Sequence, residues 1–227
     1  MKSTNKKINV CPTNSKNFLL KTSCLISLLL CQTVFADVTM TGGFVSDYYF
    51  RGWNLGDGGA YASVDYSQDG FYAGTWWIDD STGGNDGLET DYYLGYGKEY
   101  DSFSWSVGYT RYEYTYVSDF EQELSLNLTY GDFSFDLISG DDDDGAIAED
   151  YSVFVATYSH SAFELTLGAG DYSDLDDASW TWAEVSFSSE LANEVSASLH
   201  LGIKSDDLIG SQDDGYIYLD ISKSFDL

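Results

Sequence analysis

Acidic side chains recur at alternate positions along this sequence, which has thirty-eight Asp and Glu against ten Lys and Arg. Acids that share one face of a strand form a surface that attracts cations. If that face lines an open passage, the passage should prefer cations, whereas in a plugged or very narrow one the acids would only be hydrated. Arg51 and Lys204 are the bases on this face. In the register that we predict, its acids are Asp47, Asp65, Glu89, Asp91, Glu121, Glu123, Asp136, Asp150, Glu164, Glu194 and Asp220.

Asp47 and Arg51 have opposite charges and the same parity on the first predicted strand. A carboxylate and a guanidinium at this spacing could pair, or could help to narrow a passage near its outer end. The alternative is a structural ion pair that fixes the first loop. The sequence leaves both interpretations open.

The candidates for a catalytic base are the two histidines, His160 and His200. His160 falls in a short turn, whereas His200 shares the polar face of its strand with Ser196 and Ser198. A Ser and His pair could serve nucleophilic catalysis. No oxyanion motif accompanies these residues, and a polar lumen explains them without catalysis. We therefore predict that the protein is not an enzyme.

Clusters of Asp mark several links between the predicted strands. Such oxygen-rich clusters could bind Ca²⁺ or Mg²⁺ that bridges to lipopolysaccharide phosphates, but none has the Gly and Glu spacing of an EF-hand loop. We expect solvated acidic loops, with neither a bound metal nor a cofactor. The clusters lie at 141–144, 174–177, 206–207 and 213–214.

Residues 1–36 have the features of a secretory signal peptide. Five Lys and no acid accompany an apolar run from Cys24 to Ala36, with small residues near the predicted cut before Asp37. A short N-terminal anchor is the alternative. All three cysteines lie in this segment, so residues 37–227 cannot form a disulfide framework or a Cys-ligated zinc site.

The charge of the predicted mature chain excludes a basic nucleic-acid footprint. Without the leader, five basic residues oppose thirty-eight acids, which gives a net charge of −33. Strong acidity can indicate disorder, but a hydrophobic fraction of 43% and an aromatic fraction of 17% argue for a folded chain.

From Asp37 onward, apolar residues recur at every second position, which is the period of a β-strand. Gly, Asp, Asn and Ser separate the runs. No later run reaches the roughly 20 apolar residues of a membrane helix, so strands must make any membrane crossing. The predicted strands are 37–50, 58–67, 70–78, 88–99, 102–116, 120–130, 132–139, 148–158, 161–171, 178–188, 192–204 and 214–227.

Short turns alternate with longer acidic links along the whole chain. Outer-membrane barrels have short periplasmic turns and long outer loops. The alternation predicts an all-β, antiparallel, up-and-down transmembrane barrel of about twelve strands in a Gram-negative outer membrane, with both termini periplasmic. A soluble β-sandwich explains neither the strand length nor the alternation.

The faces of most strands can be assigned by parity. Leu124, Leu126 and Leu128 share one face, whereas Glu121 and Glu123 share the other. Burying so many acids in a closed core would cost several kcal/mol per unpaired charge, so we expect a watery lumen and an apolar exterior in contact with lipid and lipopolysaccharide. Strands 70–78 and 178–188 have ambiguous parity. Trp and Tyr near strand ends suit aromatic girdles at the interfaces, namely Trp53, Trp76, Trp77, Trp180 and Trp182.

The last predicted strand alternates apolar residues up to the carboxyl terminus. Ile217, Leu219 and Ile221 share one face with Phe225 and Leu227. This pattern is similar to the C-terminal targeting signal of outer-membrane barrels, although a terminal Phe is the usual form. We therefore expect the barrel-assembly machinery to be a partner during biogenesis.

The segment Ser46-Asp47-Tyr48-Tyr49-Phe50-Arg51-Gly52 resembles the opening motif of the TorF family of porin-like proteins. Further similar segments lie at 70–76, 89–96 and 107–112, and the order and spacing agree across about 40–130. The resemblance implies an outer-membrane barrel and a porin-like role, and it implies no particular substrate.

These observations predict a monomeric barrel that acts as a diffusion channel for small hydrophilic solutes, with a preference for cations. The alternative is a closed barrel with a structural or surface-interaction role. An open pore needs few bulky residues across the lumen, yet Tyr49, Phe154, Tyr216 and Tyr218 are predicted to point inward.

Overall fold

The computed structural model describes residues 37–80, 87–115, 120–143, 148–173, 178–206 and 214–227. The predicted signal peptide lies outside these ranges. Among the described residues, no helix is both long enough and apolar enough to cross a membrane.

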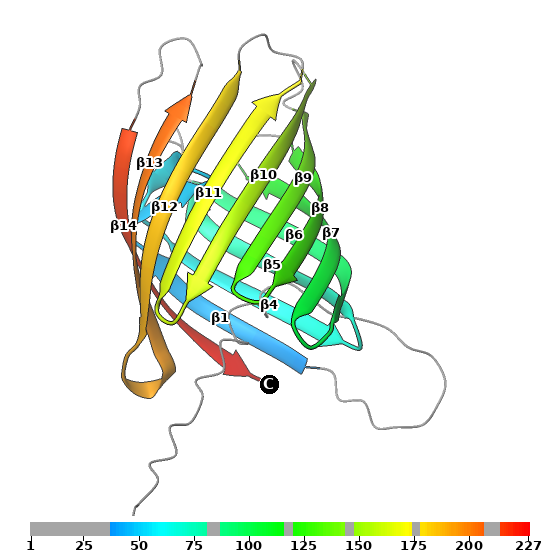
Figure 1. The fold of residues 1–227 in the computed structure, drawn as a ribbon. Helices are drawn as coiled ribbons and strands as arrows, with labels where there is room; N and C mark the ends of the chain where they lie inside the picture. Colours follow the sequence, from blue (N-terminus) through cyan, green and yellow to red (C-terminus); the bar gives the residue numbers. More distant parts are fainter. Residues whose placement is uncertain (1–36, 81–86, 116–119, 144–147, 174–177, 207–213) are drawn as a thin grey trace, which may run out of the picture.

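Twelve antiparallel strands close into a barrel, which confirms the predicted fold (Figure 1). Strands that are consecutive in the wall pair with each other, and β1 pairs with β14 to close the ring. Closure leaves no edge in the twelve-stranded wall unpaired among the described residues. The wall consists of β1 (Asp37–Val45), β4 (Ala60–Gln68), β5 (Phe71–Asp80), β6 (Gly87–Glu99), β7 (Phe103–Tyr114), β8 (Phe120–Tyr130), β9 (Phe133–Asp143), β10 (Ala148–His160), β11 (Phe163–Tyr172), β12 (Ser179–Glu190), β13 (Val195–Asp206) and β14 (Asp214–Asp226).

The two ends of the barrel differ in their links. One end carries the turns of two to four residues together with the start of β1 and the end of β14 (Figure 1). One of these turns contains the short 3-10 helix η4 (Ala192–Glu194). Links at the other end have four to fourteen residues. In barrels of this class the end with short turns is periplasmic, so both ends of the barrel chain lie there.

The first predicted strand, 37–50, is wrong beyond Val45. The wall strand β1 ends there, and a separate hairpin of β2 (Asp47–Phe50) and β3 (Trp53–Asp57) follows it. Arg51 and Gly52 form the turn with φ of 51° and 85°. Two consecutive positive φ values are typical of the type I′ turns that join hairpin strands.

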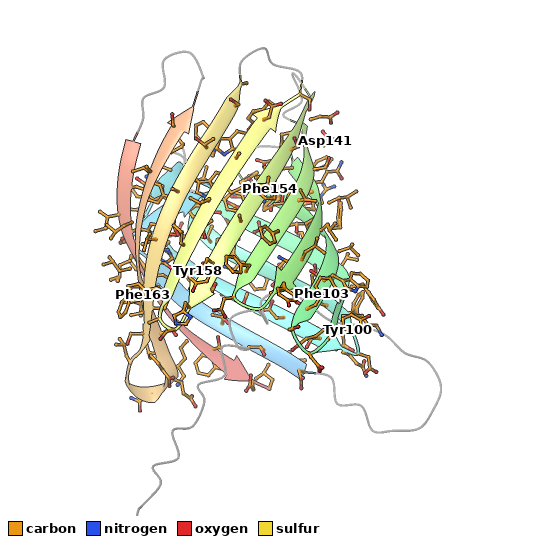
Figure 2. All side chains as sticks on the ribbon, viewed as in Figure 1. Tyr100, Phe103, Asp141, Phe154, Tyr158 and Phe163 are labelled. Atoms are coloured by element: carbon orange, nitrogen blue, oxygen red, sulfur yellow. The ribbon has the colours of Figure 1, made fainter. Side chains whose placement is uncertain are left out.

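The outer face of the barrel is apolar. Leu124 is 65% exposed, and the outward positions of neighbouring strands carry further exposed Leu, Ile and Phe. Phe154, predicted to face inward, instead lies on this outer face, where it is 45% exposed and stacks on Phe135 (Figure 2). Asp150 shares its parity on β10 and is also exposed, so its predicted inward placement is wrong as well.

An aromatic belt surrounds the periplasmic end, but most of the predicted girdle residues are not in it. The belt includes Tyr100, Phe103, Tyr158 and Phe163, all exposed near the short turns (Figure 2). Of the predicted girdle, Trp77 has the outward parity of β5, but the others do not lie on the outer face. Those four are part of the hairpin or the interior, namely Trp53, Trp76, Trp180 and Trp182.

Rings on the inner face lie against inward glycines of adjacent strands. A Cβ added at Gly140 would lie 2.1 Å from the Tyr151 ring, and one at Gly168 would lie 2.1 Å from the Trp182 ring. Tyr72 of β5 likewise lies against Gly95 of the adjacent β6 and reaches Gly108 of β7, the strand beyond it. Glycines therefore let bulky rings lie along the wall instead of projecting across the lumen.

Candidate functional site

The β2–β3 hairpin crosses the interior of the barrel. Tyr49 stacks on Tyr216 of β14, with ring centroids 4.3 Å apart, while Arg51 pairs with Glu123 of β8. In the ring of twelve strands, β14 and β8 are separated by five strands on either side. Two residues of one short hairpin thus contact opposite walls, which only a segment inside the lumen can do.

The hairpin lies in the outer part of the lumen. Glu123 is the fourth residue of β8, and Tyr216 is the third residue of β14. Both strands begin at the end with the longer links. Small polar side chains, including Thr41, Ser125 and Asn127, line the wall nearer the periplasmic end. The hairpin therefore crosses the outer portion of the interior, and the inner portion is polar.

Arg51 and Glu123 anchor the turn of the hairpin to the wall. The guanidinium donates two hydrogen bonds of 2.5 and 2.9 Å to the carboxylate, which is 4% exposed. The hydroxyls of Tyr112 and Tyr151 each donate another bond of 2.9 Å to Glu123. Burial alone would lower the pKa of Arg51, but the hydrogen bonds and charge of Glu123 outweigh it and raise this pKa.

Further contacts hold both strands of the hairpin. The Tyr48 hydroxyl donates a 3.0 Å bond to Glu89 of β6, and burial, with the charge of Glu89, raises the pKa of Tyr48 well above its ordinary value. On β3, Trp53 packs against Trp180, and the ammonium of Lys204 lies 3.3 Å from the centroid of the Trp53 ring. The hairpin is thus fixed by aromatic, polar and ionic contacts together.

Close packing also restricts the turn of the hairpin. A Cβ added at Gly52 would lie 2.8 Å from the Cβ of Trp182 and close to Lys204. Gly52 also has a positive φ, a backbone conformation that residues other than glycine rarely adopt. Glycine is therefore needed here both for the turn and for the approach to the wall.

Most of the acids predicted on the lumen face lie at inward positions, where hydroxyl or amide groups bond them. Asp65 accepts from Tyr93 and Ser63, Asp220 from Tyr61, Asp136 from Asn127, Glu121 from Tyr114 and Glu164 from Ser159. Glu89 and Asp91 lie two residues apart on the inward face of β6, near the hairpin. The inner wall is therefore an array of carboxylates paired largely with tyrosines.

Two of the sequence predictions about charged residues need correction here. Asp47 lies at the base of the hairpin and accepts a bond from Ser46, whereas Arg51 reaches Glu123 instead of Asp47. Glu194 lies in a short turn, exposed and 3.4 Å from Lys223, and so lines no part of the lumen. The turn displaces it because β13 begins only at the next residue.

Sequence reasoning missed Glu184 on β12. Its carboxylate lies 2.8 Å from Nδ1 of His200 and accepts a 3.0 Å bond from Tyr216. β12 pairs with both neighbours in regular register, so its alternation is uninterrupted. Inward Trp180 and Trp182 obscured the pattern, although Glu184, Ser186 and Ser188 share one parity and could have indicated the face.

The structure also places the residues considered for catalysis and metal binding. His160 is exposed at a short turn, 3.3 Å from Asp132, while Ser198 bonds Ser188 and not His200. No group of metal-ligating side chains occurs within the described ranges. Asp141, from one of the acidic clusters, lies near the outer end of β9 and accepts a bond from Gln122 (Figure 2). Most other residues of those clusters lie outside the described ranges.

Several solved structures are similar to this barrel, whereas the sequence matches no protein-family model and no curated protein. A membrane protein from a study of in-meso crystallization is 8% identical, with a TM-score of 0.56 over 84% of each chain. The KdgM porin is 10% identical, with a TM-score of 0.53 over 83% of this chain and 99% of its own. A COG4313 outer membrane channel from Pseudomonas putida F1 is 13% identical, with a TM-score of 0.51 over 86% and 97%.

The fold is that of an outer-membrane β-barrel. The apolar outer face and the belt at the periplasmic end agree with this placement, because an exposed apolar band of this kind is stable only against lipid. The predicted fold and outer-membrane location are confirmed. Membership of the TorF family stays a prediction.

Proposed function

We propose that this protein is an outer-membrane channel for passive diffusion of small hydrophilic solutes, and that the β2–β3 hairpin forms its constriction. The observation that carries the proposal is the hairpin that spans the lumen between β8 and β14. Solutes would pass between the hairpin and the polar wall. The similar barrels include a porin and an outer membrane channel, which supports a channel role in general.

The charges around the hairpin support a preference for cations. Arg51 is paired with Glu123, so its positive charge is neutralised at the constriction. Additional carboxylates lie at inward positions of the neighbouring wall, at Glu89, Asp91 and Glu184. A passage lined by such groups concentrates cations and repels anions.

The residue arrangement supports a small-solute pathway more than catalysis. Inward Ser198 and His200 are engaged with other polar groups, through the Ser188–Ser198 and His200–Glu184 contacts. We therefore propose no enzymatic activity and no cofactor. Membrane lipid, lipopolysaccharide and, during biogenesis, the barrel-assembly machinery are the proposed partners, and the motifs near the hairpin favour kinship with the TorF family.

Single-channel recording of refolded residues 37–227 in a planar bilayer under a KCl gradient tests this function. We expect discrete conductance steps and a reversal potential that favours K⁺. A variant with Ser46–Gly58 replaced by a short Gly and Ser linker should give larger steps. If both folded proteins are silent, the channel proposal is wrong and the alternative of a structural or surface-interaction barrel is favoured.

A further inference from the structure

A cavity of about 180 Å³ lies between the base of the hairpin and the barrel wall. Its lining combines two carboxylates, Asp47 from β2 and Asp220 from β14, with five aromatic side chains. The rings come from the hairpin and from three strands of the wall. They are Tyr48, Tyr49, Tyr61, Trp76 and Tyr218.

Packing holds these rings in two groups. Trp76 contacts both Tyr48 and Tyr61, with ring centroids 5.9 and 5.8 Å apart. Tyr49 and Tyr218 stack on each other at 5.7 Å and an interplanar angle of 18°. Since each ring is supported by another, a ligand would meet a lining that is already ordered and would lose little binding energy in ordering it.

The two carboxylates give the cavity a negative charge. Asp220 accepts the hydroxyl hydrogen of Tyr61 at 2.9 Å, and Asp47 accepts that of Ser46 at 3.0 Å. Within the described parts of the chain, neither forms an ion pair, and Arg51 is paired with Glu123. Negative charge beside aromatic rings is the combination that attracts a cation with an apolar surface.

We propose that this cavity binds a small organic ammonium ion, such as a quaternary amine, on its way through the channel. A metal cation prefers a shell of several charged or carbonyl oxygens, whereas only two carboxylates line this cavity, and no group of three or more His, Cys, Asp or Glu that could hold a metal occurs among the described residues. A neutral solute can donate hydrogen bonds to the carboxylates but gains no charge attraction from them. The volume is below the roughly 300 Å³ at which pockets for drug-sized ligands begin, so the ligand should have only a few heavy atoms.

This proposal deepens the channel function by naming a class of solute. Transport of the ammonium ion rests on the proposed channel function, but its binding does not, because binding can be measured without conduction. The probes are choline and its uncharged isostere 3,3-dimethylbutan-1-ol, titrated by calorimetry into the refolded barrel in detergent micelles. We expect choline to bind roughly tenfold or more tightly than the isostere, because only choline gains the ionic and cation–π contacts.

Two variants locate the site. Asp220→Asn retains an oxygen acceptor for Tyr61 but removes the charge, and Trp76→Leu removes the central ring; each should weaken choline binding by about tenfold. Asp171→Asn, which alters an exposed acid elsewhere on the barrel, serves as the control and should bind as the parent does. Heat-modifiable migration in gels verifies that each variant has folded.

Equal binding of choline and its isostere would overturn the proposal, as would unchanged choline binding in folded Asp220→Asn and Trp76→Leu. If Trp76→Leu fails to fold, Tyr49→Leu replaces it, with the same expected loss. Conductance without choline binding would support the channel proposal and refute the ammonium site. Choline binding without conductance would support the site and refute the channel.

Discussion

Arg51 and Glu123 form a bidentate ion pair that joins the turn of the inserted hairpin to the wall strand β8. The pair is largely buried, with the two side chains 14% and 4% exposed. Removing one partner from a buried pair leaves an unpaired charge, which typically costs about 3–5 kcal/mol. The position of the hairpin across the lumen should therefore depend strongly on this contact.

Replacing Arg51 with Ala should release the tip of the hairpin and increase the single-channel conductance severalfold. Glu123→Gln should act in the same direction, because it leaves the guanidinium without its counterion. The swapped double variant Arg51→Glu with Glu123→Arg should recover part of the original conductance. Planar-bilayer recording of the folded variants measures each effect.

The control for this prediction is Arg111→Ala. Arg111 pairs with Glu113 on the outer face, where the side chains are 37% and 44% exposed, so loss of that pair should leave the conductance unchanged. An identical increase in Arg111→Ala and Arg51→Ala would mean that general loosening, and not the hairpin anchor, sets the conductance.

Gly140→Ala should destabilise the barrel by about 1–3 kcal/mol, the usual cost of overpacking. The new methyl group would collide with the Tyr151 ring, whose hydroxyl bonds Glu123. Urea unfolding in lipid vesicles, followed by tryptophan fluorescence, measures the change in the free energy of unfolding. Gly42→Ala is the matched control, because a Cβ there meets nothing within 4 Å. Equal stability of the two variants would show that the ring is free to move.

Leu124→Arg should reduce the free energy of unfolding by about 2–4 kcal/mol, the cost of a cation near the bilayer midplane. Leu124 lies on the outer face in the middle of the apolar band. Tyr130→Arg, at the periplasmic end of the same strand, should cost only about 0–1 kcal/mol. Reversal of this order in vesicle unfolding experiments would contradict the membrane placement of the outer face.

The barrel could be predicted from the sequence because strand period, turn residues and the alternation of link lengths are local signals. Even the short and long links could be assigned to the two ends before strand pairing was known. Parity is also a local signal, and it placed acids such as Asp65 and Asp136 correctly on the inner face. Phe154 was misplaced because its alternation is weak: Val153 and Val155, its apolar neighbours, face the interior.

The hairpin could not be predicted as an inserted element, because its position depends on contacts far apart in the sequence. Arg51 and Glu123 are separated by 72 residues, and the spacing of Arg51 favoured Asp47 instead. The continuous alternation through Phe50 concealed the end of β1. The Arg51-Gly52 turn was a local clue, but Arg is not one of the residues that usually mark a type I′ turn.

Acid should open the channel, whereas alkali up to about pH 10 should not act through the hairpin anchor. The raised pKa of Arg51 means that its guanidinium stays charged at all lower pH values and loses its charge only as the pH rises through that raised pKa. The vulnerable partner is Glu123, because protonation removes its negative charge and weakens the pair. Acidification also neutralises other inward carboxylates, so cation preference should fall as conductance rises.

Recording across the pH range tests this expectation, with Glu123→Gln as the reference. Acid should not increase the single-channel conductance of this variant. If acid increases its conductance as much as that of the wild type, the pH response belongs to other lumen acids.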